Sequence, residues 1–264
     1  MTLPWWQGLI LGTVQGVSEF LPISSSGHLV LAQWLLGYQS PGVSFEVLLH
    51  LATLMSVLLV YWRRVAWLAH GMARGQSDAW QFAGLLVLAS IPAAVAGLLF
   101  RDVFEAQFES PVALGIDFLV TALVLWSTRW VVKADAESPV RWPTAVAMGL
   151  VQVLAILPGV SRSGTTIAAS LWCRVGARAA AEFSFLMAVV VIAGTGLLEA
   201  MRLAEGGGRL IVEWGVVWAF LAALVSGVFA IRLLVMLLRR GRFHLFAPYC
   251  AVVGSLTLVW AVWH

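Results

Sequence analysis

The sequence predicts an all-α integral membrane protein with about six full transmembrane helices and two re-entrant helical hairpins. Of the 264 residues, 61% are hydrophobic and only 11% are charged. A soluble domain carries about 25% charged residues to cover its surface, so a chain this poor in charge needs lipid around it. Long apolar runs and two related polar segments inside apolar sequence complete the prediction.

Six apolar runs are long enough to cross a bilayer, which takes about 20 residues. They cover approximately residues 43–62, 80–100, 112–132, 180–201, 213–236 and 245–263, and short charged or Gly/Pro-containing loops separate them. Two further stretches, about 4–36 and 143–173, are apolar on average, but each carries a proline and a Ser/Gly cluster in its middle. Backbone at membrane depth must be buried in protein or line a polar cavity if its helix is broken. These two stretches are therefore expected to be re-entrant hairpins.

The distribution of Lys and Arg predicts the orientation. Segments 63–79, 129–141, 174–178 and 239–242, all read as loops, hold most of the 16 basic residues: Arg63, Arg64, Arg74, Arg129, Lys133, Arg141, Arg174, Arg178, Arg239, Arg240 and Arg242. The alternate loops 101–111 and 202–212 hold only Arg101, Arg202 and Arg209. Positive loops stay in the cytoplasm. The first hairpin then enters from the outer face, the second enters from the cytoplasmic face, and the C-terminus lies outside.

The two hairpins resemble each other. Aligned without gaps, six residues of the first, Gly12, Val14, Gln15, Ser24, Ser26 and Gly27, match Gly149, Val151, Gln152, Ser161, Ser163 and Gly164 of the second. Three predicted spans lie between them, and an odd number of crossings inverts the second copy. The chain is therefore expected to be one membrane domain, 1–264, with an inverted repeat of about 1–132 and 140–264. Such repeats build a polar site near the bilayer midplane.

Small hydroxyl residues and glycines gather where the second helix of each hairpin is expected to start. A helix N-terminus offers unpaired N–H groups and a positive dipole end, which suit a phosphate. The alternative is that the same residues only cap the helices. The expected phosphate-binding residues are Ser24, Ser26, Gly27, Ser161, Ser163, Gly164 and Thr165.

Four residues form the expected catalytic set: Glu19, Ser25, His28 and Arg162. Arg162 is costly inside an apolar region, and its planar fork suits two phosphate oxygens, although a structural ion pair with Glu19 is the alternative. Glu19 can hold a divalent cation or act as a base, and Gln15, one helical turn earlier, can add an amide oxygen. An imidazole titrates near neutral pH, so His28 can serve as acid, base or nucleophile; the alternative is that it is only a hydrogen-bonded anchor at the membrane interface. His50 lacks comparable neighbours in sequence and is expected to be an ordinary span residue.

The motifs resemble those of the bacterial undecaprenyl pyrophosphate phosphatase family, the bacitracin-resistance proteins. Gln15-Gly-Val-Ser-Glu19-Phe-Leu-Pro-Ile-Ser-Ser-Ser-Gly-His28 is similar to that family's (Glu/Gln)-x-x-x-Glu motif with its following Ser/Thr-Gly-His. Pro158-Gly-Val-Ser-Arg162-Ser-Gly-Thr-Thr166 is similar to its Pro-Gly-x-Ser-Arg-Ser-x-x-Thr motif. Gln15 stands where many members carry a second glutamate. Further likeness at Phe45-Glu46-Val, Ile91-Pro92-Ala and Ala181-Glu182-Phe-Ser-Phe extends the resemblance over nearly the whole chain.

The resemblance implies a phosphatase that cleaves undecaprenyl diphosphate to the monophosphate and recycles the lipid carrier of cell-wall synthesis. It also implies a divalent cation, Mg²⁺ or Ca²⁺, and a site open to the periplasmic face of the bacterial inner membrane. Ser25 is the first choice of nucleophile, with His28 taking its proton; His28 itself or metal-activated water stay open as nucleophiles.

A membrane transporter or lipid flippase is the competing class of protein, because inverted repeats with broken helices are common in transporters. The expected partners are a polyprenyl diphosphate and membrane lipids. A homodimer is allowed, and no nucleic acid is expected.

Overall fold

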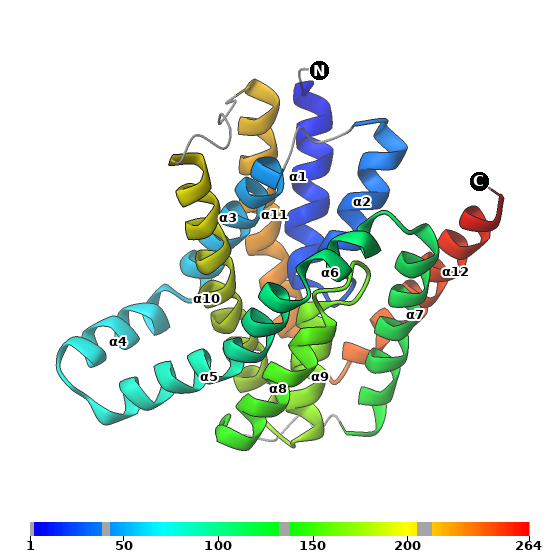
Figure 1. Ribbon diagram of the computed structural model, residues 1–264. Helices are drawn as coiled ribbons and strands as arrows, with labels where there is room; N and C mark the ends of the chain where they lie inside the picture. Colours follow the sequence, from blue (N-terminus) through cyan, green and yellow to red (C-terminus); the bar gives the residue numbers. More distant parts are fainter. Residues whose placement is uncertain (1–2, 39–42, 132–137, 205–212, 264) are drawn as a thin grey trace.

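The structure is a computed structural model that describes residues 3–38, 43–131, 138–204 and 213–263. Within these ranges the regular elements are all helices (Figure 1), as the composition predicted. Lys133 and Arg209, two of the residues used to predict the orientation, lie outside the described ranges.

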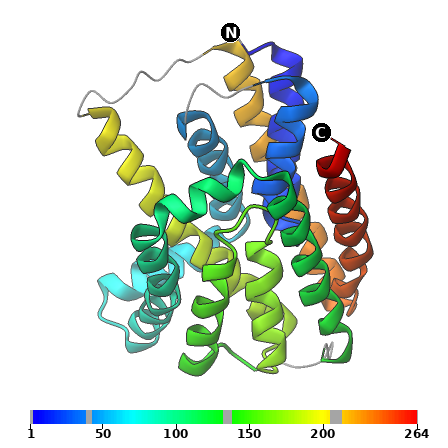
Figure 2. The same cartoon turned by 45° about the vertical axis from the view of Figure 1, so that its right-hand side comes forward.

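Two helical hairpins enter the molecule from opposite ends. Helices α1 (Trp5–Phe20) and α2 (Ser25–Leu36) form the first hairpin, and α8 (Trp142–Leu154) and α9 (Arg162–Trp172) form the second. In Figures 1 and 2 the blue pair descends from the end that holds the N-terminus, the green pair rises from the other end, and their tips meet in the middle. Both predicted hairpins are therefore present.

Long apolar helices surround the hairpins. They are α3 (Val43–Val60), α5 (Ser77–Leu99), α7 (Pro111–Ser127), α10 (Ala177–Ala204), α11 (Trp214–Arg239) and α12 (Ala247–Trp263). Five are long and apolar enough to span a membrane, counting the short helices η1 (Thr128–Trp130) with α7 and η2 (Phe243–Phe246) with α12. A sixth span requires α3 together with α4 (Trp62–Ala73), from which it is bent by 81°. The protein is thus a multi-pass membrane protein, close to the predicted count.

The loop prediction was wrong at two places. Most of segment 63–79 belongs to helix α4 and the start of α5, and most of segment 101–111 belongs to helix α6 (Arg101–Phe108). Both helices are short and carry charged residues, so a search for long apolar runs reads them as loops. The guanidinium of Arg64 ties α4 to the body through a 2.9 Å ion pair with Glu182 and through its position over the ring of Phe82.

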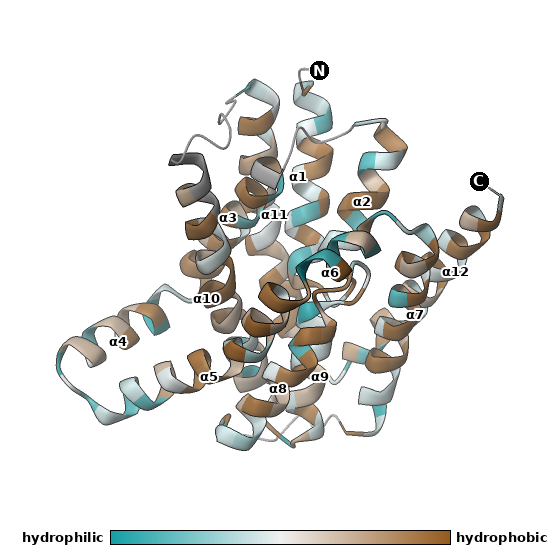
Figure 3. Ribbon diagram, viewed as in Figure 1, coloured by the Kyte–Doolittle hydropathy of each residue, from teal (hydrophilic) through white to brown (hydrophobic). Residues whose placement is uncertain are grey.

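The outer surface is apolar. Leu35, Leu123 and Val262 are 88%, 70% and 82% exposed, and Figure 3 shows hydrophobic colouring along much of the long helices. A soluble protein rarely exposes contiguous apolar area on this scale. Lipid is therefore the natural solvent of these faces.

Glycines bring α1 into backbone contact with α11. A Cβ on Gly8, Gly12 or Gly16 would collide with a main-chain carbonyl oxygen of α11, at Gly215, Ala219 and Ala223 respectively. Small residues four apart allow such close approach of membrane helices. The first helix of hairpin one is therefore fixed against a helix from the far end of the chain.

Helix packing is the same when the two halves are exchanged. The first helix of each hairpin packs against the second long span of the other half, α1 on α11 and α8 on α5. The first spans, α3 and α10, pack together, and so do the last spans, α7 and α12. This is the packing expected of an inverted repeat, while the boundaries 1–132 and 140–264 stay a prediction.

Candidate active site

The tip of the first hairpin is a tight serine turn. Ser24 caps α2 by accepting a 3.4 Å hydrogen bond from the backbone N–H of Gly27, and its φ of 71° is left-handed, unusual for a residue with a side chain. Ser24 Oγ also accepts a 3.1 Å bond from the N–H of Gly159 in the second hairpin. Gly27 leaves no room for a Cβ beside the Phe118 ring. The two tips therefore depend on each other for their conformation.

The tip of the second hairpin rests on α7. Gly159, at a φ of 103°, offers its carbonyl to Thr121 Oγ1 at 2.8 Å, and the N–H of Ser161 donates to the same hydroxyl at 3.0 Å. Ser161 then caps α9 by accepting from the N–H of Gly164 at 3.1 Å. Arg162 is the first residue of α9, so this turn aims its side chain across the interface between the hairpins.

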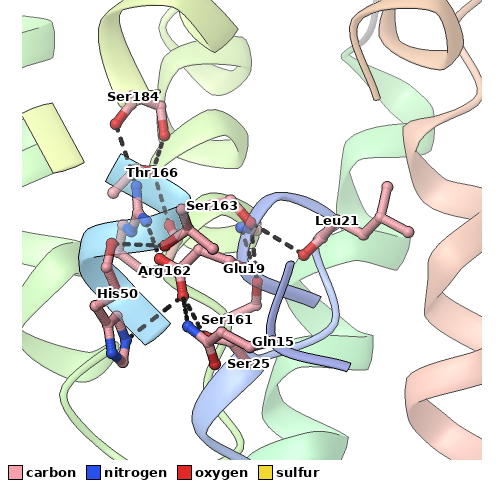
Figure 4. Close-up of polar contacts among 12 residues, drawn as sticks. Gln15, Glu19, Leu21, Ser25, His50, Ser161, Arg162, Ser163, Thr166 and Ser184 are labelled. Atoms are coloured by element: carbon pink, nitrogen blue, oxygen red, sulfur yellow. Dashed lines mark hydrogen bonds and ion pairs between the residues drawn. The ribbon is translucent and has the colours of Figure 1, made fainter. Parts of the chain in front are cut away.

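Glu19, near the end of α1, is the centre of the polar network between the tips (Figure 4). Its Oε1 accepts a 2.5 Å charge-assisted bond from Arg162 Nη2. Its Oε2 accepts a 2.6 Å bond from the hydroxyl of Ser25 and a 3.0 Å bond from Gln15 Nε2. The structure thus brings together four predicted site residues, two from α1, one from α2 and one from α9.

Helix α10 supports the far side of Arg162. The carbonyl of Ser184 accepts from Arg162 Nη1 at 3.4 Å, and the Ser184 hydroxyl is 2.7 Å from that of Thr166. The guanidinium carries five N–H donors, so these bonds leave donors for a phosphate. Arg162 can therefore pair with Glu19 and bind a phosphate at the same time, although the ion pair was expected as the alternative to phosphate binding.

His50 belongs to the same network, although it was expected to be an ordinary span residue. Its Nε2 is 3.6 Å from Glu19 Oε2, while its Nδ1 lies 2.8 Å from the carbonyl of Glu46. Helical spacing places Glu46 and His50 on one face of α3. No pattern in the sequence shows that this face meets hairpin one.

The ring nitrogens of His28 are engaged by groups other than the Ser25 hydroxyl. Its Nδ1 is 2.7 Å from the carbonyl oxygen of Ser24, and its Nε2 is 2.8 Å from the hydroxyl of Tyr249 in α12. The hydroxyl of Ser25 donates to Glu19 instead. The expected Ser25–His28 pair is therefore replaced by Ser25–Glu19.

The other expected phosphate-binding residues mostly hold the tips in shape. Ser24 and Ser161 cap helices, Ser163 Oγ bonds to the carbonyl of Leu21 at 3.2 Å, and Thr165 Oγ1 bonds to the carbonyl of Ser161 at 2.9 Å. Gly27 and Gly164 are buried, whereas the side chains of Ser25 and Ser26 are only half-buried. Ser25, Ser26 and Arg162 are thus the side chains best placed to meet a ligand.

The residues fit a cation only if the substrate supplies most of its ligands. Within the described ranges no three His, Cys, Asp or Glu side chains converge as a metal site. Gln15 Oε1 is buried and accepts no hydrogen bond from any described group, so one oxygen beside Glu19 is available. Mg²⁺ is commonly held by one or two protein oxygens together with phosphate and water, and that arrangement matches Gln15 and Glu19.

Known proteins resemble the chain over nearly its full length. The family described as "Bacitracin resistance protein BacA" matches residues 8–256. The undecaprenyl-diphosphatase of Desulfosudis oleivorans is 39% identical, covering 96% of this chain and 97% of that protein. The undecaprenyl-diphosphatase of Moorella thermoacetica is 40% identical, covering 95% of this chain and 95% of that protein. The undecaprenyl-diphosphatase of Bacteroides fragilis is 34% identical, covering 97% of this chain and 98% of that protein. This chain therefore belongs to the bacitracin-resistance protein BacA family.

Proposed function

We propose that this protein is a phosphatase that hydrolyses undecaprenyl diphosphate to undecaprenyl phosphate and inorganic phosphate. The lipid carrier then returns to cell-wall synthesis, which gives bacitracin resistance. Family membership and the undecaprenyl-diphosphatase relatives support this assignment. The observation that carries it is the Ser25 hydroxyl bonded to Glu19, which is paired with Arg162. A hydroxyl beside a base and a guanidinium suits phosphoryl transfer better than transport.

Ser25 is the proposed nucleophile and Glu19 the proposed base. The Ser25 oxygen attacks the terminal phosphorus, its proton moves to Glu19 Oε2, and the bridging P–O bond breaks; the departing prenyl monophosphate takes that proton from Glu19. Water then attacks the phosphoserine and gives one proton to Glu19, the Ser25 O–P bond breaks, and Glu19 returns the proton to Ser25 as inorganic phosphate leaves. The 2.6 Å Ser25–Glu19 bond is within the range for direct proton transfer.

Arg162 is the proposed phosphate-binding residue. Negative charge on the phosphoryl oxygens is stabilised by a fixed guanidinium in a site with little water. Glu19 and the Ser184 carbonyl hold that guanidinium from two sides, so little reorganisation is needed when substrate arrives. Ser26, half-buried beside Ser25, is the second side chain offered to the phosphate.

A divalent cation, Mg²⁺ or Ca²⁺, is proposed as the cofactor. Gln15 and Glu19 would hold it together with the diphosphate. When bound, it would neutralise phosphoryl charge and so assist the same transfer.

The proposed location is the bacterial inner membrane with the site open to the periplasm. The start of α1 and the end of α12 lie toward one end of the molecule (Figures 1 and 2). Basic residues adjoin the ends of helices that reach the other end, including Arg74 after α4, Arg141 before α8 and Arg239 at the end of α11. The positive-inside rule assigns that second end to the cytoplasm.

Phosphate release in detergent tests the function. Purified protein is expected to release inorganic phosphate from undecaprenyl diphosphate without any ion gradient, which a transporter would not do. Ser25→Ala is expected to lower kcat by about 1,000-fold or more, because the nucleophile is lost. Ser26→Ala, the neighbouring hydroxyl, is the control and is expected to lose less than about tenfold. No phosphate release by the wild-type protein would refute the function; full turnover by Ser25→Ala would refute only the serine nucleophile.

A further inference from the structure

Both ring nitrogens of His28 are engaged by fixed groups. The carbonyl oxygen of Ser24 can only accept a hydrogen bond, so Nδ1, 2.7 Å away, carries the ring proton. In the neutral ring Nε2 is then an acceptor, and the Tyr249 hydroxyl at 2.8 Å donates to it. This network fixes the tautomer and orientation of the ring.

The residue that His28 holds is the strained one. Within the described part of the chain, Ser24 and Arg174 are the residues other than glycine with positive φ. Such a conformation persists only when its surroundings over-determine it. The Ser24 carbonyl receives both the main-chain N–H of His28, at 3.2 Å, and Nδ1 of its ring. Ser25 follows directly, so the direction of its hydroxyl depends on this turn.

Tyr249 supports His28 from a distant part of the chain. Its ring is stacked on His28, with centroids 5.6 Å apart and planes 10° apart, and Phe118 meets the same imidazole edge-on at 5.1 Å. The next residue of α12, Cys250, is buried with its Sγ 3.7 Å from the carbonyl oxygen of Pro22. The start of α12 therefore borders the tip of the first hairpin at two successive residues.

We propose that Tyr249 is a positioning residue for the reaction at Ser25. Its hydroxyl orients His28, His28 holds the Ser24 carbonyl, and the resulting turn aims the Ser25 hydroxyl at Glu19. The proposal rests on the phosphatase function. It assigns His28 a positioning role as well, and it gives α12 a part in catalysis although none of the proposed phosphate-binding residues belongs to α12.

Three substitutions test the proposal in detergent-solubilised full-length protein. Tyr249→Phe keeps the stacked ring and removes only the hydroxyl; kcat is expected to fall about tenfold with KM changed less than about twofold, because a small misplacement of the nucleophile slows chemistry. His28→Asn keeps an N–H donor close to the Ser24 carbonyl and is expected to retain at least about ten times the kcat of His28→Ala. Tyr38→Phe, which removes a hydroxyl from a ring packed on Phe45, is the matched control and is expected to be fully active.

A double-mutant cycle completes the test. In the His28→Asn background, Tyr249→Phe should cause no further loss of kcat, because the hydroxyl acts only through the imidazole.

Wild-type kcat in Tyr249→Phe would overturn the proposal. Equal inactivity of His28→Asn and His28→Ala would also overturn it, since that pattern means that His28 transfers protons. Thermal unfolding of each variant identifies losses of activity caused by misfolding. If the His28 variants misfold, the kcat of Tyr249→Phe alone tests the proposal. Absence of phosphate release by the wild-type protein would instead refute the function on which the proposal rests.

Discussion

At the residue scale, Glu19 connects the groups that the proposed reaction needs. One oxygen is bonded to Arg162 and the other to Ser25 and Gln15, with His50 at 3.6 Å. A buried carboxylate is stable only when it is paired and hydrogen-bonded, and here the groups that stabilise it are also the proposed nucleophile and phosphate ligand. Removing one of them disturbs the others.

Arg162→Lys separates charge from geometry. Lysine keeps the positive charge but loses the planar fork that holds Glu19 and the phosphate together. We expect kcat to fall by about 100-fold, measured as phosphate release. Arg74→Lys, an exposed residue after α4, is the control and should be unaffected. Wild-type turnover in Arg162→Lys would mean that charge alone suffices.

The sequence predicted most members of this site but not all their contacts. Glu19, Ser25 and Arg162 stand out because polar groups in an apolar chain are costly. His50 and Tyr249 could not be found this way, because their role comes from which helix faces meet in space. His28 was predicted to belong to the site, but with the wrong partner. Ser25 was expected because it is close in sequence, whereas the fold brings Tyr249 of α12 to the His28 ring.

At the element scale, α1 illustrates how glycine determines packing. Three glycines one helical turn apart place its backbone against that of α11, and the same helix carries Gln15 and Glu19. The spans were predictable because length and apolarity suffice to identify them. Helices α4 and α6 were not, because each is short and charged.

Gly12→Ala tests this contact. The added Cβ would collide with the carbonyl oxygen of Ala219, so we expect a loss of about 1–3 kcal/mol of stability and a lower Tm in detergent. Gly84→Ala on α5 is the matched control, since a Cβ there meets nothing within 4 Å; its Tm should be unchanged or slightly higher. Equal Tm values for the two variants would contradict close packing of α1 on α11.

At the scale of the whole molecule, two hairpins from opposite ends meet in the middle of a helical bundle whose exposed side chains include many large apolar ones. The spans, close to the expected number, and the opposed hairpins followed from composition, the lengths of the apolar runs, the repeated motif and loop charge. The hydrogen bonds between the two tips, Ser24–Gly159 and Ser163–Leu21, could not be predicted from the sequence, because they join segments far apart in the chain.

Cysteine labelling tests the orientation. With Cys173 and Cys250 replaced by serine, Glu109→Cys and Gln76→Cys each place one thiol in an exposed turn, before α7 and before α5 respectively. An impermeant maleimide should label position 109 from the periplasm, and position 76 only after the inner membrane is permeabilised. The reverse pattern would invert the proposed topology.

The glycine face of α1 also has a consequence for the order of synthesis. Its partner α11 follows about 200 residues later, which at the usual rate of translation is a delay of about 10 to 40 s. Until α8 and α9 are made, the newly inserted first hairpin has neither the helix it packs against nor the second tip that fixes its turn, and α11 follows later still. Until Arg162 is made, the Glu19 carboxylate needs water, lipid headgroups or an insertase around it, and the protein cannot act on its lipid substrate before the ribosome has nearly finished the chain.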